Sequence, residues 1–159
     1  MKRVLSIVVP LAGILVLAAA VSAWAGGSGN DNRSGNSGKT LTVVEHATTD
    51  ATTDTGPQGD SAGDVLTFAN EVFDRSDTRQ VGTDQGYCIR VVAGASYECN
   101  WTTFLHGGQI VVEGPFYDAK DSTLAITGGT GRFSKARGTM DLHALENGTK
   151  FAFEFHINR

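Results

Sequence analysis

The sequence predicts an all-β protein, an eight-stranded antiparallel barrel that closes on itself, and three observations lead to this prediction. Apolar and polar residues alternate with a period of two from Leu41 onward, which is the pattern of strands with one buried face. Turn-forming residues, many of them glycine, separate these segments. No segment after the N-terminal region keeps a helical period over a useful length. Eight short strands joined by hairpins favour a barrel, because closure removes exposed sheet edges.

The last strand is the clearest, because phenylalanine and isoleucine alternate there with smaller or polar residues from Phe151 to Asn158. Asn147-Gly148 before it is a strong hairpin signal. Three glycines within residues 128–131 predict a sharp corner between strands, and the Gly-Lys-Ser/Thr of a phosphate-binding loop does not follow them. The polar loop from Thr48 to Ala62 predicts a lid or rim. The predicted strands cover residues 41–48, 64–73, 86–93, 96–105, 108–114, 122–127, 139–144 and 151–158.

The N-terminus predicts export from the cell. Lys2 and Arg3 precede a largely apolar run from Val4 to Val21, and Ala23-Trp-Ala25 is a small-x-small cleavage site. A signal peptide over residues 1–25 makes the mature protein secreted and free of the membrane. The alternative is a retained membrane anchor, because the apolar run approaches spanning length.

The segment after the signal predicts a flexible leader. Residues 26–39 are small and polar and contain no large apolar side chain, so they cannot offset the entropy of ordering. The barrel domain is therefore expected over residues 40–159, where the alternating pattern begins.

Charge and motif content exclude several classes of function. The formal net charge is -4, and it becomes more negative once Lys2 and Arg3 are removed, which argues against nucleic acid and anionic membranes as partners. The four histidines show no metal-ligand spacing, so no metal site is expected. A nucleophile elbow of the hydrolase type is also missing from the sequence.

The two cysteines predict a disulfide. Cys88 and Cys99 lie in an exported chain, and a two-residue turn at Ala93-Gly94 places them directly opposite each other on paired strands. Such a bridge contributes about 3 kcal/mol, mainly through the unfolded state. Two free thiols, one of them catalytic, remain the alternative.

Two polar residues interrupt apolar strand faces. Glu45 shares a face with Leu41 and Val43, and Asn70 shares one with Phe68 and neighbouring apolar positions. If these faces point inward, burial raises the pKa of Glu45 and makes it a proton shuttle near neutral pH, while Asn70 holds a substrate oxygen or a water. Alternatively, Glu45 lies solvated at the rim and Asn70 only satisfies a backbone group.

Three blocks of the chain, in this order, resemble allene oxide cyclase-like barrels and the related dirigent proteins. They are Gly63–Asp74, Val81–Cys88, and Glu113-Gly-Pro-Phe-Tyr117 followed by the segment from Asp121 to Phe133. The resemblance implies an eight-stranded barrel, often a homotrimer, that acts on small apolar molecules without a cofactor. Members of this group steer cyclisation, isomerisation or coupling.

The resemblance also assigns residues. Glu45 and Asn70 match cavity positions of the family and are the candidate catalytic residues, and Pro57 matches a loop proline that binds water. Phe68 and Phe153 are the other candidate ligand contacts. Two positions depart from the family, because Ala47 replaces an asparagine and Cys88, a cavity cysteine, is expected to be bridged.

Three functional hypotheses follow. The first is a secreted barrel that binds a small hydrophobic ligand as a cofactor-free cyclase, isomerase or dirigent-type stereochemical guide. The second is a non-catalytic carrier or scavenger of such ligands. The third is a surface protein whose lumen is filled by side chains, with the aromatic residues Phe68, Phe104, Phe151, Phe153 and Phe155 as the plug.

Overall fold

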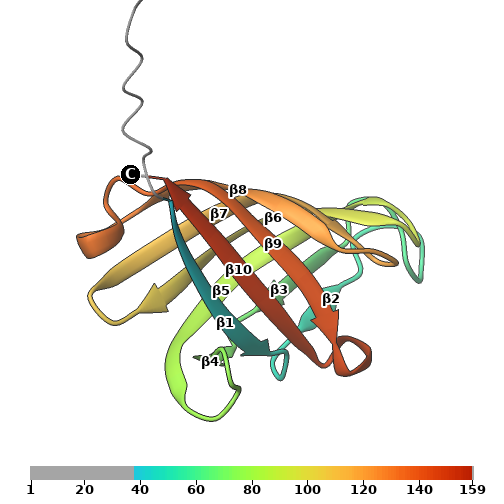
Figure 1. Cartoon of the computed structure of the whole chain (residues 1–159). Coiled ribbons are helices and arrows are strands. Elements are labelled where there is room, and N and C mark those ends of the chain that lie inside the picture. The colour runs from blue at the N-terminus through green and yellow to red at the C-terminus, as the bar shows by residue number, and fades with distance from the viewer. Residues whose placement is uncertain (1–37, 159) are drawn as a thin grey trace, which may run out of the picture. The chain divides into compact units, whose positions relative to one another are not determined.

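The computed structural model describes residues 38–158, which form a β-barrel (Figure 1). The predicted signal peptide and most of the predicted leader lie outside the described residues, and Lys39 is already in the first strand. The strands are β1 (Lys39–His46), β2 (Ala51–Thr53), β3 (Val65–Phe68), β4 (Glu71–Asp74), β5 (Gln80–Val92), β6 (Ser96–Leu105), β7 (Gly108–Tyr117), β8 (Ser122–Gly129), β9 (Arg137–Leu145) and β10 (Lys150–Asn158).

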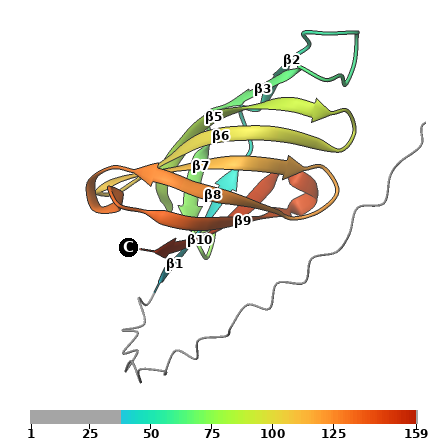
Figure 2. The ribbon, with the colours of Figure 1, turned by 90° about the horizontal axis from the view of Figure 1, so that it is seen from above.

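The barrel closes through one additional strand pairing. The sheet order is β2-β3-β5-β4-β1-β10-β9-β8-β7-β6, and β5 also pairs with β6. Since β3 and β4 pair with successive parts of β5, they occupy one place in the ring. β2 pairs with the other edge of β3, and β1 with the other edge of β4, so β1 and β2 also share one place. The ring therefore has eight places, and every strand pair in it is antiparallel. Figure 2 shows the same ribbon turned by 90°. The predicted eight-stranded closed barrel is confirmed.

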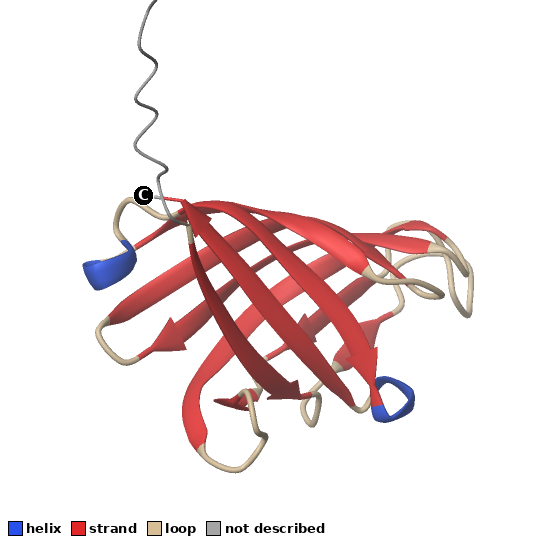
Figure 3. Cartoon of the chain, in the orientation of Figure 1, coloured by secondary structure: helices blue, strands red, loops and turns tan. Residues whose placement is uncertain are grey.

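Two short 3-10 helices complete the described part of the chain. They are η1 (Gly131–Phe133) and η2 (Glu146–Gly148), and Figure 3 shows them at opposite ends of the barrel. Gly131 has a φ of 56°, so the glycine-rich corner does require a conformation that L side chains avoid. No helix in residues 38–158 is long and apolar enough to cross a membrane.

Strand boundaries differ from the prediction around Asn70. The expected strand 64–73 is divided at Ala69–Asn70 into β3 and β4, and the register of β4 against β5 shifts again after Val72. β5 starts at Gln80 rather than at residue 86, because it must pair with both β3 and β4. The extra length brings Asp84 into a strand.

The hairpin turns after β5 and after β9 set the register at the η2 end of the lumen. Ala95 N–H donates to the Val92 carbonyl at 3.0 Å, and Cys88 lies opposite Cys99 as predicted. A bulge between Arg90 and Val92 adjusts the strand before the turn. The hairpin between β9 and β10 is also confirmed, with four residues between the paired Leu145 and Lys150.

The half of the lumen nearer η1 is filled by apolar side chains. These residues come from six strands and from η1, and each is at most 4 % exposed. Close packing of this kind supplies most of the burial free energy of a small domain. The residues are Val43, Val72, Ile110, Val112, Leu124, Ile126, Phe133, Met140, Phe155 and Ile157.

Candidate functional site

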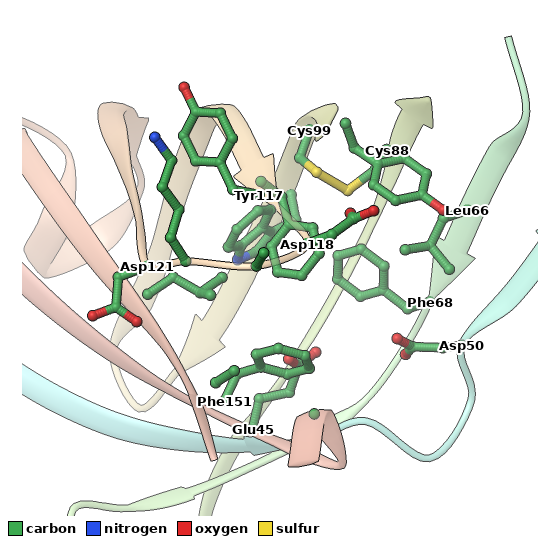
Figure 4. Close-up of a pocket in the computed structure, with 18 of the residues that line it drawn as sticks. Glu45, Asp50, Leu66, Phe68, Cys88, Cys99, Tyr117, Asp118, Asp121 and Phe151 are labelled. Carbon is green, nitrogen blue, oxygen red and sulfur yellow. A yellow bond between two sulfur atoms is a disulfide. The ribbon is translucent and has the colours of Figure 1, made fainter. Parts of the chain in front are cut away.

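The half of the lumen nearer η2 is hollow. It contains a cavity of about 740 Å³, open to solvent at that end (Figure 4). This volume lies within the range of small-molecule sites. A lumen completely filled by side chains is therefore wrong, because Phe68, Phe151 and Phe153 line the cavity instead of occupying it. Other lining residues include Glu45, Leu66, Cys88, Arg90, Tyr97, Cys99, Trp101, Phe116, Tyr117, Asp118, Leu142 and Ala144.

Glu45 lies in the cavity wall, from the inward face of β1. Its backbone pairs with Phe151 on one side and Val72 on the other, and the residue is 5 % exposed. Asn70 Nδ2 donates a hydrogen bond of 2.8 Å to Glu45 Oε1. Glu45 is thus buried among aromatic side chains rather than solvated at the rim.

Asn70 is placed behind Glu45 and does not line the cavity. Its Oδ1 accepts hydrogen bonds from the backbone N–H of Thr48 at 3.1 Å and of Thr49 at 2.9 Å, and from the Thr49 hydroxyl at 2.9 Å. Its second amide hydrogen goes to Asp50 Oδ1 at 2.8 Å. Both donors and the acceptor are used, so this geometry makes Asn70 a residue that orients Glu45.

Asp84 is a second buried carboxyl that the sequence analysis missed. It lies on β5, 2 % exposed, and exchanges backbone hydrogen bonds with Asn70. Its side chain hydrogen-bonds with that of Glu45. Oδ2 of Asp84 accepts no hydrogen bond from any donor among the described residues. Alternation back from Cys88 would have found Asp84, had the strand been extended to Gln80.

The two carboxyls titrate as a pair. Burial, opposed by the Asn70 hydrogen bond and assisted by the charge of Asp50, raises the pKa of Glu45 to about 7. Burial and the negative charge of Glu45 raise the pKa of Asp84 to about 9. Two carboxyls this close cannot both ionise cheaply. At neutral pH the pair therefore holds at least one proton, and Glu45 can accept or release a second.

Trp101 forms the wall of the cavity on β6. Its ring packs edge-on against Phe68, with centroids 6.0 Å apart, and at a tilt against Phe153 at 5.5 Å. Gly86 is its partner on β5, and a Cβ added to Gly86 would lie 2.2 Å from the Trp101 Cβ. The glycine is therefore needed for the indole to take this position.

Cys88 and Cys99 form the predicted disulfide, and both line the cavity. No free cysteine occurs among the described residues. The alternative of two free thiols, with one as a nucleophile, is wrong for this structure. The bridge lies beside the aromatic wall, where Figure 4 shows its sulfur atoms.

Arg90 holds the mouth of the cavity together. Its Nη1 donates to both carboxylate oxygens of Asp118 at 2.8 Å, and its guanidinium lies 3.6 Å from the centre of the Tyr97 ring. Its Nε lies 2.7 Å from Asp60 Oδ1 and forms an ion pair with it. One buried cation thus joins two rim loops.

Pro57 lies in the exposed loop between β2 and β3 and is not a lining residue of the cavity. The loop is attached through Asp64, which accepts hydrogen bonds from the backbone of Thr55 and Ser61, and these bonds hold the pKa of Asp64 below its usual value. The structure thus brings together Glu45, Asn70, Phe68 and Phe153, but not Pro57. Residues 38–158 contain no group of three or more potential ligand side chains suited to a metal ion.

Several solved structures of other proteins have a similar barrel. One named pyocyanin demethylase has 26 % sequence identity and a TM-score of 0.67, covering 76 % of this chain and all of that one. A pterocarpan synthase dirigent protein has 16 % identity and a TM-score of 0.63, covering 77 % and 95 %. An exo-specific intermolecular Diels-Alderase has 14 % identity and a TM-score of 0.59, covering 77 % and 99 %. The latter two show a common fold only.

The family model for allene oxide cyclase matches residues 37–159. This range includes every strand of the barrel, the carboxyl pair and the aromatic wall. The chain belongs to the allene oxide cyclase family.

Proposed function

We propose that this protein binds a small apolar molecule in its lumen and moves a proton on it, as a cofactor-free cyclase or isomerase. The observation that carries the proposal is Glu45, which is buried in the wall of an aromatic cavity and hydrogen-bonds with a second buried carboxyl, Asp84. A buried carboxyl with a pKa near neutrality can act as both base and acid at physiological pH.

The mechanism assigns one role to each residue. The aromatic wall of Phe68, Trp101 and Phe153 excludes water and holds the ligand near a reactive conformation. Glu45 takes a proton from an acidic C–H or O–H of the ligand and returns it to another ligand atom, so that the net change is an isomerisation or a ring closure. Asp84 keeps its proton and donates a hydrogen bond to the Glu45 carboxylate when Glu45 is charged, while the Asn70 hydrogen bond fixes the direction of that carboxylate.

The relatives support this cavity chemistry without fixing the reaction. The similar protein named pyocyanin demethylase acts, by its name, on a small molecule by removing a methyl group, which is not a cyclisation. The barrel therefore admits more than one reaction, and the substrate of this chain is to be identified by experiment.

The Kemp elimination of 5-nitrobenzisoxazole tests the proposal, because a carboxylate base in an apolar cavity removes the ring proton while the N–O bond breaks. We expect saturable turnover that rises with pH through the pKa of Glu45, and a loss of about 100-fold or more in Glu45→Gln. Glu154→Gln, on the outer face of β10, is the matched control and should match the wild type. Full turnover in Glu45→Gln would remove this residue from the mechanism.

The carrier hypothesis is the second candidate, and the Arg90 contacts at the mouth favour it. Arg90 joins the two rim loops through Asp60 and Asp118, and loops held together in this way can keep a bound ligand inside the cavity. Mass spectrometry of molecules that co-purify with the protein, before and after incubation, separates the two functions. An unchanged ligand favours the carrier, and a rearranged one favours the enzyme.

Secretion and assembly remain predictions. The disulfide fits an oxidising compartment, and cleavage after Ala25 is checked by N-terminal sequencing of the exported protein. A homotrimer would cover the exposed apolar outer face of β5, where Tyr87, Ile89 and Val91 are 43 to 55 % exposed. Light scattering of the purified protein tests this assembly.

A further inference from the structure

Asp50 is a third carboxyl group at the cavity, in addition to Glu45 and Asp84. It belongs to the loop between β1 and β2, and it lines the cavity together with Glu45 (Figure 4). Unlike the other two carboxyls, Asp50 is exposed to solvent. No step of the proposed reaction uses its carboxylate.

One amide nitrogen holds Asp50 beside Glu45. Asn70 Nδ2 donates one hydrogen to Glu45 Oε1 and the other to Asp50 Oδ1, each at 2.8 Å. The two acceptor oxygens are therefore no more than twice 2.8 Å, or 5.6 Å, apart. A charge at such a separation acts strongly on a buried group, because little water lies between them to weaken it.

The two residues before Asp50 attach its loop to Asn70. The backbone N–H groups of Thr48 and Thr49 donate to Asn70 Oδ1. The Thr49 hydroxyl also donates to this oxygen, and it accepts a hydrogen bond of 2.8 Å from the Ala69 N–H. Because these bonds do not involve the Asp50 side chain, Asp50 can be substituted without releasing the loop.

The charge of Asp50 is not balanced by a cation of the protein. The other charged side chains that line the mouth of the cavity each have a partner. They form the pairs Arg90–Asp118 and Asp121–His143, and Lys120 lies over the ring of Tyr117. Asp50 forms no ion pair within residues 38–158. Its field therefore reaches Glu45 without a counter-charge.

The titratable groups that act on Glu45 are Asp84 from β5 and Asp50 from the loop. Its strand neighbours, Phe151 on β10 and Val72 on β4, carry no charge. Burial raises the pKa of Glu45 most, the Asn70 hydrogen bond opposes this, and the charge of Asp50 raises the pKa further. The electrostatics thus agree with the hydrogen-bond geometry.

We propose that Asp50 is a positioning residue of the reaction: its negative charge, fixed beside Glu45 by the Asn70 amide, makes Glu45 a stronger base toward the ligand. This inference rests on the proposed function and concerns the regulation of the same site. Asp50 does not itself take the ligand proton. It lies at the solvent-exposed edge of the site, so the strength of the buried base is set from the rim of the barrel.

The titration of Glu45 tests the inference without any substrate. The full-length protein is labelled with ¹³C at the side-chain carboxyl of glutamate, and the signal lost in Glu45→Gln identifies Glu45. Asp50→Asn keeps an oxygen that can accept from Asn70 and removes the charge. We expect this variant to lower the midpoint of the Glu45 titration by about 0.5 to 1 on the pH scale. An unchanged midpoint would overturn the inference.

A control variant and added salt separate the charge of Asp50 from a structural role. Asp121→Asn removes another carboxylate of the cavity lining, one that is paired with His143, and should leave the midpoint where it is. Sodium chloride at about 1 M shortens the screening length to about 3 Å. It should lower the midpoint in the wild type and change it much less in Asp50→Asn. Equal salt effects in both proteins would contradict a role for this charge.

Kinetics distinguish failure of this inference from failure of the proposed function. In the Kemp elimination, Asp50→Asn should move the rise of kcat to lower pH and lower its plateau about 2- to 5-fold with KM unchanged, because a weaker base removes a proton more slowly. Turnover that depends on Glu45 but has the same profile in Asp50→Asn contradicts the role of Asp50 alone. A wild type without turnover contradicts the proposed function, and a lowered Glu45 midpoint in Asp50→Asn then still supports the action of Asp50 on Glu45.

Discussion

The two halves of the lumen are built from the same strands, but one is filled by side chains and the other contains a cavity. Toward η1, side chains such as Ile110, Met140 and Phe155 are each fully buried and leave no hollow. Toward η2, the same alternation presents Glu45, Trp101 and Phe151 to a cavity of about 740 Å³. The comparison shows that strand alternation determines which residues face inward, and that residue size and polarity determine whether the inside is solid.

The difference also separates stability from function. The solid half contributes buried apolar area without polar cost. The hollow half contains two buried carboxyls and the indole N–H of Trp101, which has no acceptor among the described residues, and each of these groups lowers the free energy of unfolding. We infer that apolar burial in the solid half offsets the free-energy cost of these buried polar groups in the hollow half.

The largest expected effect comes from paired truncations, one in each half. Phe155→Ala should lower the free energy of unfolding by about 3 to 5 kcal/mol, because it opens a void in a close-packed region. Phe151→Ala, at the cavity wall, should lower it by less than about 2 kcal/mol. Urea denaturation measures both. Equal losses at the two positions would contradict the division into a solid and a hollow half.

The disulfide should be the main stabilising element of the hollow half. Replacing both Cys88 and Cys99 by serine should lower the free energy of unfolding by about 3 kcal/mol, since the bridge closes a loop with a sequence separation of 11. The check is urea denaturation of the double variant beside the oxidised wild type. A loss smaller than 1 kcal/mol would mean that strand pairing alone fixes this wall.

The pH dependence of stability should report the carboxyl pair. Both pKa values are raised on folding, so the folded state binds more protons than the unfolded chain, and stability falls as pH rises from about 5 through 7 to 9. The slope is on the order of 1 kcal/mol per pH unit. Thermal melts of Asp84→Asn should show a flatter profile over this range.

Below pH 4 the trend should reverse. Asp64, Asp74 and Asp77 accept hydrogen bonds that lower their pKa values, so protonating them on acidification removes their contribution to stability. A wild-type profile that stays level between pH 5 and 9 would contradict the shared proton.

The smallest expected effect lies at the rim. Ser122 is buried, and its Oγ accepts a hydrogen bond of 2.9 Å from the Tyr117 N–H across the turn between β7 and β8. Ser122→Ala should lower the free energy of unfolding by about 1 kcal/mol. Hydrogen exchange of the Tyr117 amide is the direct measurement, and unchanged protection there would show that the strand ends hold the turn without this bond.

Much of the fold could be predicted because it depends on local patterns. The alternation in residues 151–158 and the positions of Cys88 and Cys99 are visible in sequence, and the structure confirms the barrel and the disulfide. The start of β5 could not be found in this way, because residues 80–85 include a glycine and polar side chains whose strand conformation depends on pairing with β4.

The candidate site was predictable only in part for the same reason. Glu45 follows from alternation on its own strand, but its partner Asp84 is 39 positions away in the printed sequence, and its burial depends on closure of the ring. The saturation of Asn70 by Thr48, Thr49 and Asp50 depends on how a loop folds back over β4. No periodicity encodes such a contact.

Gly86 shows how a residue that borders no ligand can decide ligand size. Because a Cβ at Gly86 would lie 2.2 Å from the Trp101 Cβ and 2.5 Å from the Asn100 carbonyl oxygen, a side chain there would force β6 away from β5 and displace the Trp101 ring with it. The dimensions of the cavity can therefore change in evolution by substitution at Gly86, a position that does not itself line the cavity.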